Sequence, residues 1–348
     1  MLQTTRLTKN CTGPILARSQ ARPAADLPSG LPLSGLPDHM YLLTLADRIA
    51  RGLGRIPNVE LQPHREFILS QQTVSGGFRG REGDADLYYT GFAVRALAVT
   101  GGLPDESRDL LSSFLQQQDP AACGTIDLLS WLYSAAVVQA AGGKDLLSSQ
   151  PADLVDNLIA GQLTLRRHDG GFAKASDGAL GSTYHSFLVA LVLELLGRSV
   201  PRPNALAQFL FDRQRDDGGF VEIAPMKRSG TNPTAAAVAV LRTMNLVDAE
   251  TREDVLGFLG DVISTEGGFQ ANTRIEFADG LSTFTGLLTA QDLAAADLLP
   301  LARVLKYVRS QLEISAGGFR GASWDQQADV EYTFYGLGIL GLIFSANP

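Results

Sequence analysis

The chain has 348 residues, 45% of them hydrophobic and 19% charged, and 29 Lys+Arg against 37 Asp+Glu give a formal net charge of −8. This is the composition of an ordinary globular protein. The negative charge, without a long Lys/Arg run, argues against nucleic acid and anionic membranes as partners. Cys11 and Cys123 stand apart, so we expect neither a disulfide framework nor a thiolate zinc site, and a reducing, cytoplasmic location fits best.

The two ends of the chain differ in character. Residues 1–37 are rich in Pro, Ser and Gly and lack the continuous apolar stretch of a secretory signal. We expect residues 1–40 to form a poorly ordered tail and residues 41–348 to form the folded domain. The apolar run 332–345 is shorter than the ~20 residues that span a bilayer, so we expect a buried helix and no membrane span.

A Gly-Gly-Phe triplet recurs along the folded part. It ends at Phe78, Phe172, Phe220, Phe269 and Phe319. The gaps are 94, 48, 49 and 50 residues, so the first gap is twice the others. We therefore expect a degenerate copy at residues 123–125, which completes six repeats of about 47–50 residues each.

Each repeat contains two stretches of different helical character. The stretch before the triplet is amphipathic, as in residues 209–214, and the stretch after it is apolar nearly all round, as in residues 234–241. An amphipathic helix faces solvent on one side, whereas an apolar helix must be enclosed. We predict an all-α fold in which six outer and six inner helices close into a ring. The glycines would let neighbouring chain segments approach closely.

The last apolar run also contains Gly-x-Gly-x-x-Gly at residues 336–341, which formally matches the dinucleotide-binding fingerprint. That fingerprint requires a preceding strand, and none is predicted here. We do not interpret these glycines as a nucleotide site.

The motif Gln-x-x-x-Gly-Gly-Phe, at residues 72–78 and 214–220, resembles the prenyltransferase/squalene-cyclase repeat. The family includes the β subunits of protein prenyltransferases and the class II terpene cyclases. The resemblance covers about residues 41–348 and implies a single α/α toroid (α6–α6 barrel) of six helical hairpins. It also implies chemistry at the N-terminal turns of the inner helices, which correspond here to residues 86–90, 181–185, 279–283 and 329–333.

Protein prenyltransferases hold a zinc ion that lowers the pKa of a substrate thiol. By resemblance, its Asp, Cys and His ligands would fall at Asp279, Leu281 and Tyr332 of this sequence. Leucine does not ligate and a neutral tyrosine is a poor zinc ligand, so two of the three ligands are missing and only Asp279 is left for a metal. A harder cation bound by Asp279, Asp329, Glu331 and His185 is an alternative.

The resemblance also implies a group of residues that grips a diphosphate. In the β subunits this group includes an Arg/Lys pair upstream of the zinc Asp, and here only Arg274 lies near that place, in a shifted position. Arg79 and Arg81 in the first loop are further candidates for binding an anion beside helix N-termini.

Class II cyclases instead use Asp-x-Asp-Asp, whose middle Asp is kept protonated and donates its proton to an alkene or epoxide. The nearest stretch is residues 84–89. Aligned through the following helix, Asp86 matches the first Asp of the motif and Tyr88 takes the place of the proton donor. A phenol is too weak an acid for this step. A shifted register that uses Asp84 and Asp86 is an alternative.

Aromatic residues of the inner helices are predicted to line the lumen of the ring. They are Tyr88, Phe92, Tyr184, Phe187, Phe284, Phe334 and Tyr335. Aromatic faces suit a greasy chain and a developing cation. We therefore expect an isoprenoid or another long apolar small molecule as ligand, in contact with Tyr88, Tyr184, His185, Phe284 and Tyr335.

Three functions stay open at this point. In the first, the chain is an isoprenoid-binding relative of the β subunits and a diverged prenyltransferase, with a helical α-subunit-like partner or a homo-oligomeric state. In the second, it is a non-catalytic lipid-binding or interaction scaffold. In the third, it is a small terpene-cyclase-like enzyme that uses acid catalysis. For these hypotheses taken together, the candidate catalytic residues are Asp84, Asp86, Asp279, Glu331 and Tyr332.

Overall fold

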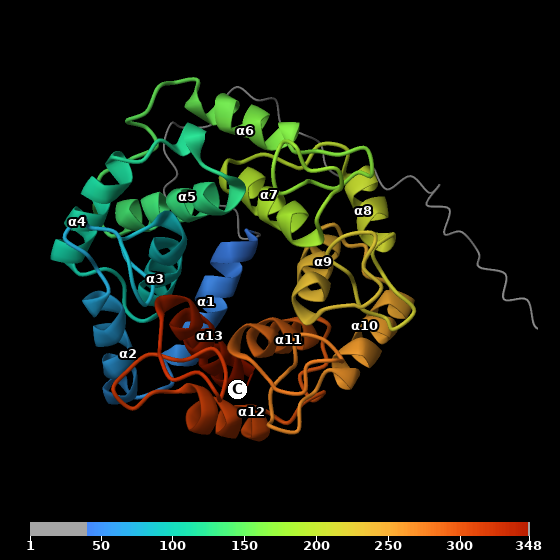
Figure 1. Ribbon diagram of the computed structural model, residues 1–348. Helices are drawn as coiled ribbons and strands as arrows, with labels where there is room; N and C mark the ends of the chain where they lie inside the picture. Colours follow the sequence, from blue (N-terminus) through green and yellow to red (C-terminus); the bar gives the residue numbers. More distant parts are fainter. Residues whose placement is uncertain (1–39, 347–348) are drawn as a thin grey trace, which may run out of the picture.

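The computed structural model describes residues 40–346, which form a closed ring of α-helices (Figure 1). A first helix, α1 (Tyr41–Leu53), precedes six hairpins that each consist of an outer and an inner helix. The outer helices are α2 (Asn58–Ser70), α4 (Asp105–Gln116), α6 (Leu154–Thr164), α8 (Pro203–Phe211), α10 (Ala249–Asp261) and α12 (Leu301–Tyr307). The inner helices are α3 (Leu87–Val99), α5 (Thr125–Ala140), α7 (Thr183–Leu195), α9 (Thr231–Thr243), α11 (Gly280–Asp292) and α13 (Val330–Ala346).

The predicted toroid of six hairpins is therefore confirmed. The degenerate second repeat replaces the triplet with a short 3-10 turn, Pro120–Ala122, before α5. The predicted tail lies outside the described residues except for Met40, which is buried. Within residues 40–346, no helix combines the length and the apolarity needed to cross a membrane.

Each Gly-Gly-Phe triplet ties an inner helix to two outer helices. The first glycine has a positive φ, 93° at Gly76, and lies so close to the next outer helix that a Cβ would come within 2.1 Å of the Leu110 carbonyl oxygen. The phenylalanine is fully buried, and its N–H donates to a hydroxyl in the first turns of the inner helix. These bonds run from Phe78 to Thr90 (2.8 Å), Phe172 to Ser186 (2.9 Å), Phe220 to Thr234 (2.9 Å), Phe269 to Thr283 (3.0 Å) and Phe319 to Thr333 (3.1 Å).

The last triplet closes the ring against the first hairpin. The Gly318 N–H donates to Nδ1 of the buried His64 in α2 at 3.0 Å, and the Phe319 ring stacks on His64 with centroids 4.5 Å apart. Helix α13 also packs against α3. Gly317 also lies against the Pro63 carbonyl group of α2, as Gly76 lies against Leu110 of α4, so the two ends of the repeat array meet by the close backbone approach that also joins interior repeats.

The glycines at residues 336–341 lie inside α13 and make room for neighbouring side chains. A Cβ on Gly336 would come within 2.3 Å of the Phe319 ring, and one on Gly338 within 2.5 Å of Phe284. The glycines therefore serve helix packing.

Helix α1 occupies the interior of the ring at the end formed by the C-terminal ends of the inner helices (Figure 1). The Tyr41 N–H donates to the Glu194 carboxylate of α7 at 3.0 and 3.1 Å, and Arg48 pairs with Asp292 of α11 at 2.8 Å. At the other end of α1, Gly52 is in backbone contact with Gly341. The sequence reasoning did not predict this position, which closes one end of the lumen.

Candidate functional site

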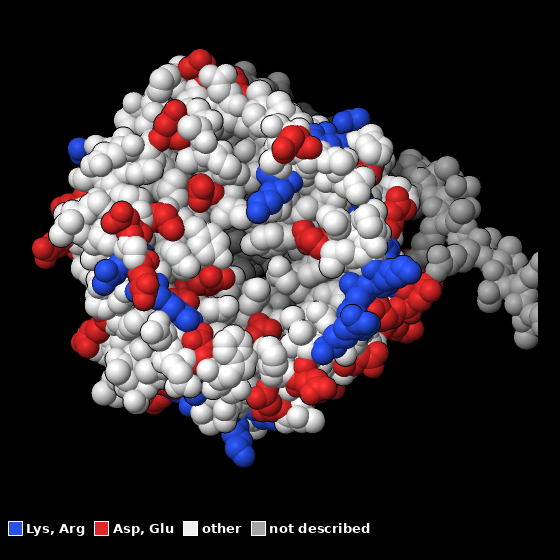
Figure 2. Space-filling view, in the orientation of Figure 1, with Lys and Arg blue, Asp and Glu red and all other residues white. Residues whose placement is uncertain are grey.

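The opposite end of the ring is the mouth, where the inner helices begin. Figure 2 shows a hollow near the middle of one face of the molecule, with basic and acidic side chains in small groups around it. Four inner helices carry a side-chain N-cap there. Asp86 accepts from Tyr89 N (2.7 Å), Ser182 from His185 N (3.0 Å), Asp279 from Ser282 N (2.7 Å) and Asp329 from Tyr332 N (2.8 Å). Such caps each stabilise a helix by about 1 kcal/mol.

The candidates in the loop before α3 and upstream of α11 face solvent. Asp84 and Asp86 are exposed, and one Asp86 oxygen is engaged in capping α3. Arg79 and Arg274 are also exposed. None of these four side chains has an enclosed environment that would hold a proton or concentrate an anion.

Arg81 is engaged within the protein. Its guanidinium forms an ion pair with Asp325 through Nη1 and Nη2, and its Nε lies 3.2 Å from Asp329 Oδ2. The pairing with Arg81 lowers the pKa of Asp325 against the effect of its burial, whereas burial raises the pKa of Asp329 in spite of Arg81. Arg81 is thus neutralised by two carboxylates before any ligand arrives.

Asp279 is held by Ser282, which donates to one carboxylate oxygen from its N–H and to the other from its hydroxyl, both at 2.7 Å. Burial raises the pKa of Asp279. Leu281 and Tyr332 add no ligand, and among residues 40–346 no group of three or more His, Cys, Asp or Glu side chains is placed to hold a metal ion. The donors present do not fit the zinc that the resemblance implies, nor the alternative harder cation.

His185 is buried in the first turn of α7. Its Nδ1 lies 3.3 Å from Ser182 Oγ, whose hydroxyl also donates to Glu222. Burial lowers the pKa of His185, which favours the neutral imidazole. Nearby Tyr184 is half-buried and lines a depression of about 480 Å³ at the mouth, together with Asp279 and Leu281.

Glu331 stands apart from the other mouth carboxylates because it is enclosed by aromatic side chains. It is half-buried in the first turn of α13, and the hydroxyl groups of Tyr88 and Tyr335 near its carboxyl group act to lower its pKa. Burial raises its pKa to about 7, with the charge of Asp329 adding to the rise. At neutral pH a large fraction of Glu331 therefore carries a proton.

Five rings of α3, α11 and α13 pack together below Glu331, and we call them the aromatic cluster: Tyr88, Phe92, Phe284, Phe334 and Tyr335. The centroid of Phe92 lies 5.1 Å from Tyr88 and 5.4 Å from Tyr335, and Phe284 lies 5.5 Å from Tyr335. Five of the residues predicted to line the lumen thus pack against one another, and all of them except Tyr88 are buried. Phe187 lies elsewhere, with its ring against Tyr41 at the α1 end.

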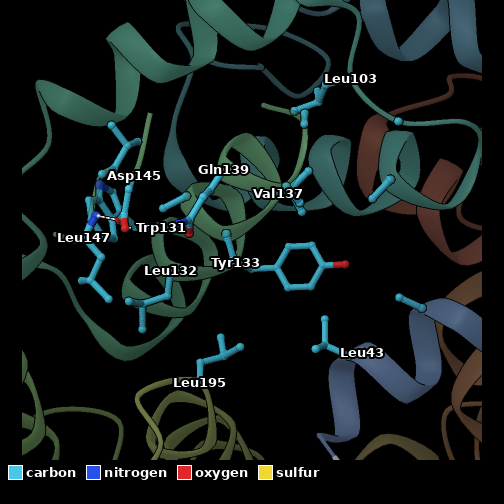
Figure 3. Close-up of a pocket in the computed structure, with 18 of the residues that line it drawn as sticks. Leu43, Leu103, Trp131, Leu132, Tyr133, Val137, Gln139, Asp145, Leu147 and Leu195 are labelled. Carbon is cyan, nitrogen blue, oxygen red and sulfur yellow. Dashed lines mark hydrogen bonds between the residues drawn. The ribbon is translucent and has the colours of Figure 1, made fainter. Parts of the chain in front are cut away.

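An apolar cavity of about 300 Å³ lies between α5 and α1, near the closed end of the ring (Figure 3). Leu43 of α1 and Leu195 of α7 line it, and the Tyr133 ring extends into the open space between Leu43 and Val137. The sequence reasoning missed this cavity because it depends on α1. It also missed Arg95, although Arg95 is the one charged residue of the apolar helix α3.

A family model described as the prenyltransferase alpha-alpha toroid domain matches residues 40–127 and 126–347. A search of curated protein sequences returned no match. Solved structures share the fold at low sequence identity. Protein geranylgeranyltransferase-I of Candida albicans, complexed with GGPP, is 16% identical with a TM-score of 0.52, and the match covers 89% of this chain and 87% of that chain.

Two further similar structures have other activities. A variant of the type II terpene cyclase MstE from Scytonema, in complex with geranylgeranyl dihydroxybenzoate, is 13% identical with a TM-score of 0.56 and coverages of 87% and 99%. An inactive variant of the alpha-1,6-mannanase GH76A of Salegentibacter sp., in complex with alpha-1,6-mannotriose, is 11% identical with a TM-score of 0.53 and the same coverages. Likeness at this level shows the fold and leaves function to the site.

Proposed function

This chain belongs to the prenyltransferase alpha-alpha toroid family, and we propose that its lumen binds a linear isoprenoid and that Glu331 starts its cyclisation by acid catalysis. The observation that carries the proposal is a carboxyl group with a pKa of about 7 directly beside the aromatic cluster. Complexes of similar structures with GGPP and with geranylgeranyl dihydroxybenzoate support an isoprenoid ligand.

The proposed reaction is an isomerisation. The Glu331 carboxyl group donates its proton to the terminal alkene carbon, or to the oxygen of a terminal epoxide, and π electrons of the next double bond form the new C–C bond. The aromatic cluster stabilises the resulting cation through its ring faces. The last cation loses a proton to water, and the Glu331 carboxylate takes one back from solvent at the mouth.

The hypothesis that this chain is a prenyltransferase has less support from the site. Its zinc would need donors that the described residues do not bring together. Its diphosphate would need free cations at the mouth, where Arg81 is already paired with Asp325 and Asp329. A carboxyl group enclosed by aromatic rings fits proton donation better than it fits either requirement.

The test is turnover of linear C15 and C20 isoprenoids, offered both as alkenes and as terminal epoxides, with products identified by gas chromatography and mass spectrometry. We expect cyclic isomers from the native protein, and a loss of at least about 100-fold in rate for Glu331→Gln, which keeps the shape but has no proton to donate.

The matched controls are Asp84→Asn and Asp86→Asn, which change exposed carboxylates of the same mouth. We expect both to retain cyclisation, although Asp86→Asn loses part of a helix cap. Full activity of Glu331→Gln would refute the acid role. If the protein binds isoprenoids but forms no cyclic product, the hypothesis of a non-catalytic scaffold is favoured over that of a cyclase.

A further inference from the structure

Arg95 lies on the lumen face of α3, beyond the aromatic cluster as seen from the mouth. It follows Tyr88 and Phe92 at helical spacing, which places all three on one face of α3, with Arg95 about 10 Å further along the axis than Tyr88. Its guanidinium carbon lies 5.3 Å from the ring centroid of Phe92 and 5.3 Å from that of Tyr133. Arg95 thus stands between the aromatic cluster and the apolar cavity that Tyr133 lines.

This guanidinium has no anionic partner among residues 40–346. The ion pairs of the described chain do not include Arg95, and its Nε is enclosed without a hydrogen-bond acceptor. Nη1 and Nη2 donate to no described residue, and neither is fully buried. Ring faces stabilise the cation in part, but a half-buried arginine normally pairs with an acid.

Three other arginines at the two ends of the lumen form ion pairs within the protein. Arg81 at the mouth pairs with two aspartates, and Arg48 and Arg242 at the α1 end both pair with Asp292, at 2.8 and 2.9 Å. Arg95 and Arg242 are the two cationic residues of the inner helices, and of these only Arg95 lacks an ion-pair partner among residues 40–346. One charge matches a carboxylate, whereas a diphosphate, with two or three negative charges, needs several cations.

We infer that Arg95 binds the carboxylate of an isoprenoid acid, and that the hydrocarbon chain of this ligand lies against the rings beside it. The inference rests on the proposed function, because it assumes an isoprenoid in the lumen. It goes further by assigning the ligand a monoanionic head group and by placing that head group deep in the ring, away from Glu331 at the mouth.

The experiment measures dissociation constants by isothermal titration calorimetry at pH 8 for farnesoic acid, farnesol and farnesyl diphosphate. We expect the native protein to bind the acid at least tenfold more tightly than the alcohol, and no less tightly than the diphosphate. In Arg95→Gln the advantage of the acid over the alcohol should fall below threefold, while the affinity for farnesol stays within twofold. Arg95→Lys should keep part of the advantage because it keeps the charge.

Lys306→Gln, which removes a positive charge from the exposed outer helix α12, is the control and should keep the full preference for the acid. Equal affinities for acid and alcohol in the native protein would overturn the inference about Arg95 and leave the proposed function standing. A preference for farnesoic acid over farnesol that persists in Arg95→Gln would also overturn it. Tighter binding of farnesyl diphosphate than of farnesoic acid to the native protein would do the same. Failure to bind all three probes would instead count against an isoprenoid in the lumen.

Discussion

Glu331 shows how position changes the chemistry of a carboxyl group. It lies two residues after Asp329 in the sequence, yet Asp329 caps α13 and pairs with Arg81, whereas Glu331 faces Tyr88 and Tyr335. Burial raises the pKa of both groups, and it raises the pKa of Glu331 to about 7. One helical turn therefore holds both an ion-paired carboxylate and a carboxyl group that is partly protonated at neutral pH.

The pH dependence of cyclisation follows from this pKa. The acid form of Glu331 is the reactive one, and it predominates below its pKa. We predict a rate that is level below about pH 7 and falls roughly tenfold per pH unit above it, measured under single-turnover conditions. A rate that increases between pH 7 and pH 9 would contradict a proton donor at this position.

The hydroxyl groups that receive the triplet N–H bonds should each matter for stability. Thr283 is fully buried and accepts from the Phe269 N–H at 3.0 Å. We predict that Thr283→Val lowers the free energy of unfolding by about 1–3 kcal/mol, because the N–H stays buried without a partner. Denaturant unfolding checks this value.

Thr285 on the same helix is the matched control. Its hydroxyl donates to the Leu281 carbonyl one turn back, and no buried N–H depends on it. Thr285→Val should change the free energy of unfolding by no more than about 0.5 kcal/mol. Equal losses at the two positions would mean that the bond to Phe269 contributes nothing specific.

Among the elements, α1 occupies one end of the ring, where the inner helices end. Its N-terminus is capped by Glu194, whose negative charge also suits the helix dipole, and its middle is fixed by Arg48 and Asp292. Leu43 of α1 lines the apolar cavity. The position of α1 therefore determines the size of that cavity and the depth of the lumen.

The contact between α1 and α13 depends on the absence of a side chain at Gly52. A Cβ there would come within 1.8 Å of the Gly341 carbonyl oxygen, so the helices would have to separate. We predict that Gly52→Ala lowers the free energy of unfolding by about 1–3 kcal/mol and weakens isoprenoid binding, measured by denaturant unfolding and calorimetry. Gly54→Ala is the control, since its Cβ would meet no atom closer than 3.4 Å. An equal response of both variants would argue against this helix contact.

At the scale of the whole molecule, the repeat predicted the ring because its signal is local. A Gly-Gly-Phe triplet, followed by an apolar stretch, occurs in the sequence of five of the six hairpins of the described chain. The degenerate copy near residue 125 was found from the interval alone. The ring closes because the last triplet packs against α2 in the way that every other triplet packs against the outer helix that follows it.

The site was less predictable, because its properties depend on which side chains meet across the ring. The amphipathic pattern of α1 predicts that one face of the helix is buried, but it does not predict that the helix lies inside the ring. The motif at Asp84 and Asp86 resembles a proton donor in sequence, yet these side chains are exposed, while Glu331 acquires its pKa from rings of other helices. Arg95 was visible as a lone charge in an apolar helix, but its lack of a partner is visible only in three dimensions.

The most direct measurement is the isotopic composition of the product formed in D2O. Because Glu331 would exchange its proton with solvent before each turnover, the native protein should form a cyclic product carrying one deuterium at the carbon that is protonated first, and Glu331→Gln should form this product at least about 100-fold more slowly. For an epoxide substrate this deuterium would lie on oxygen, so the alkene is the substrate to use. A cyclic product without deuterium, or labelled product formed by Glu331→Gln at the native rate, would contradict acid catalysis by Glu331.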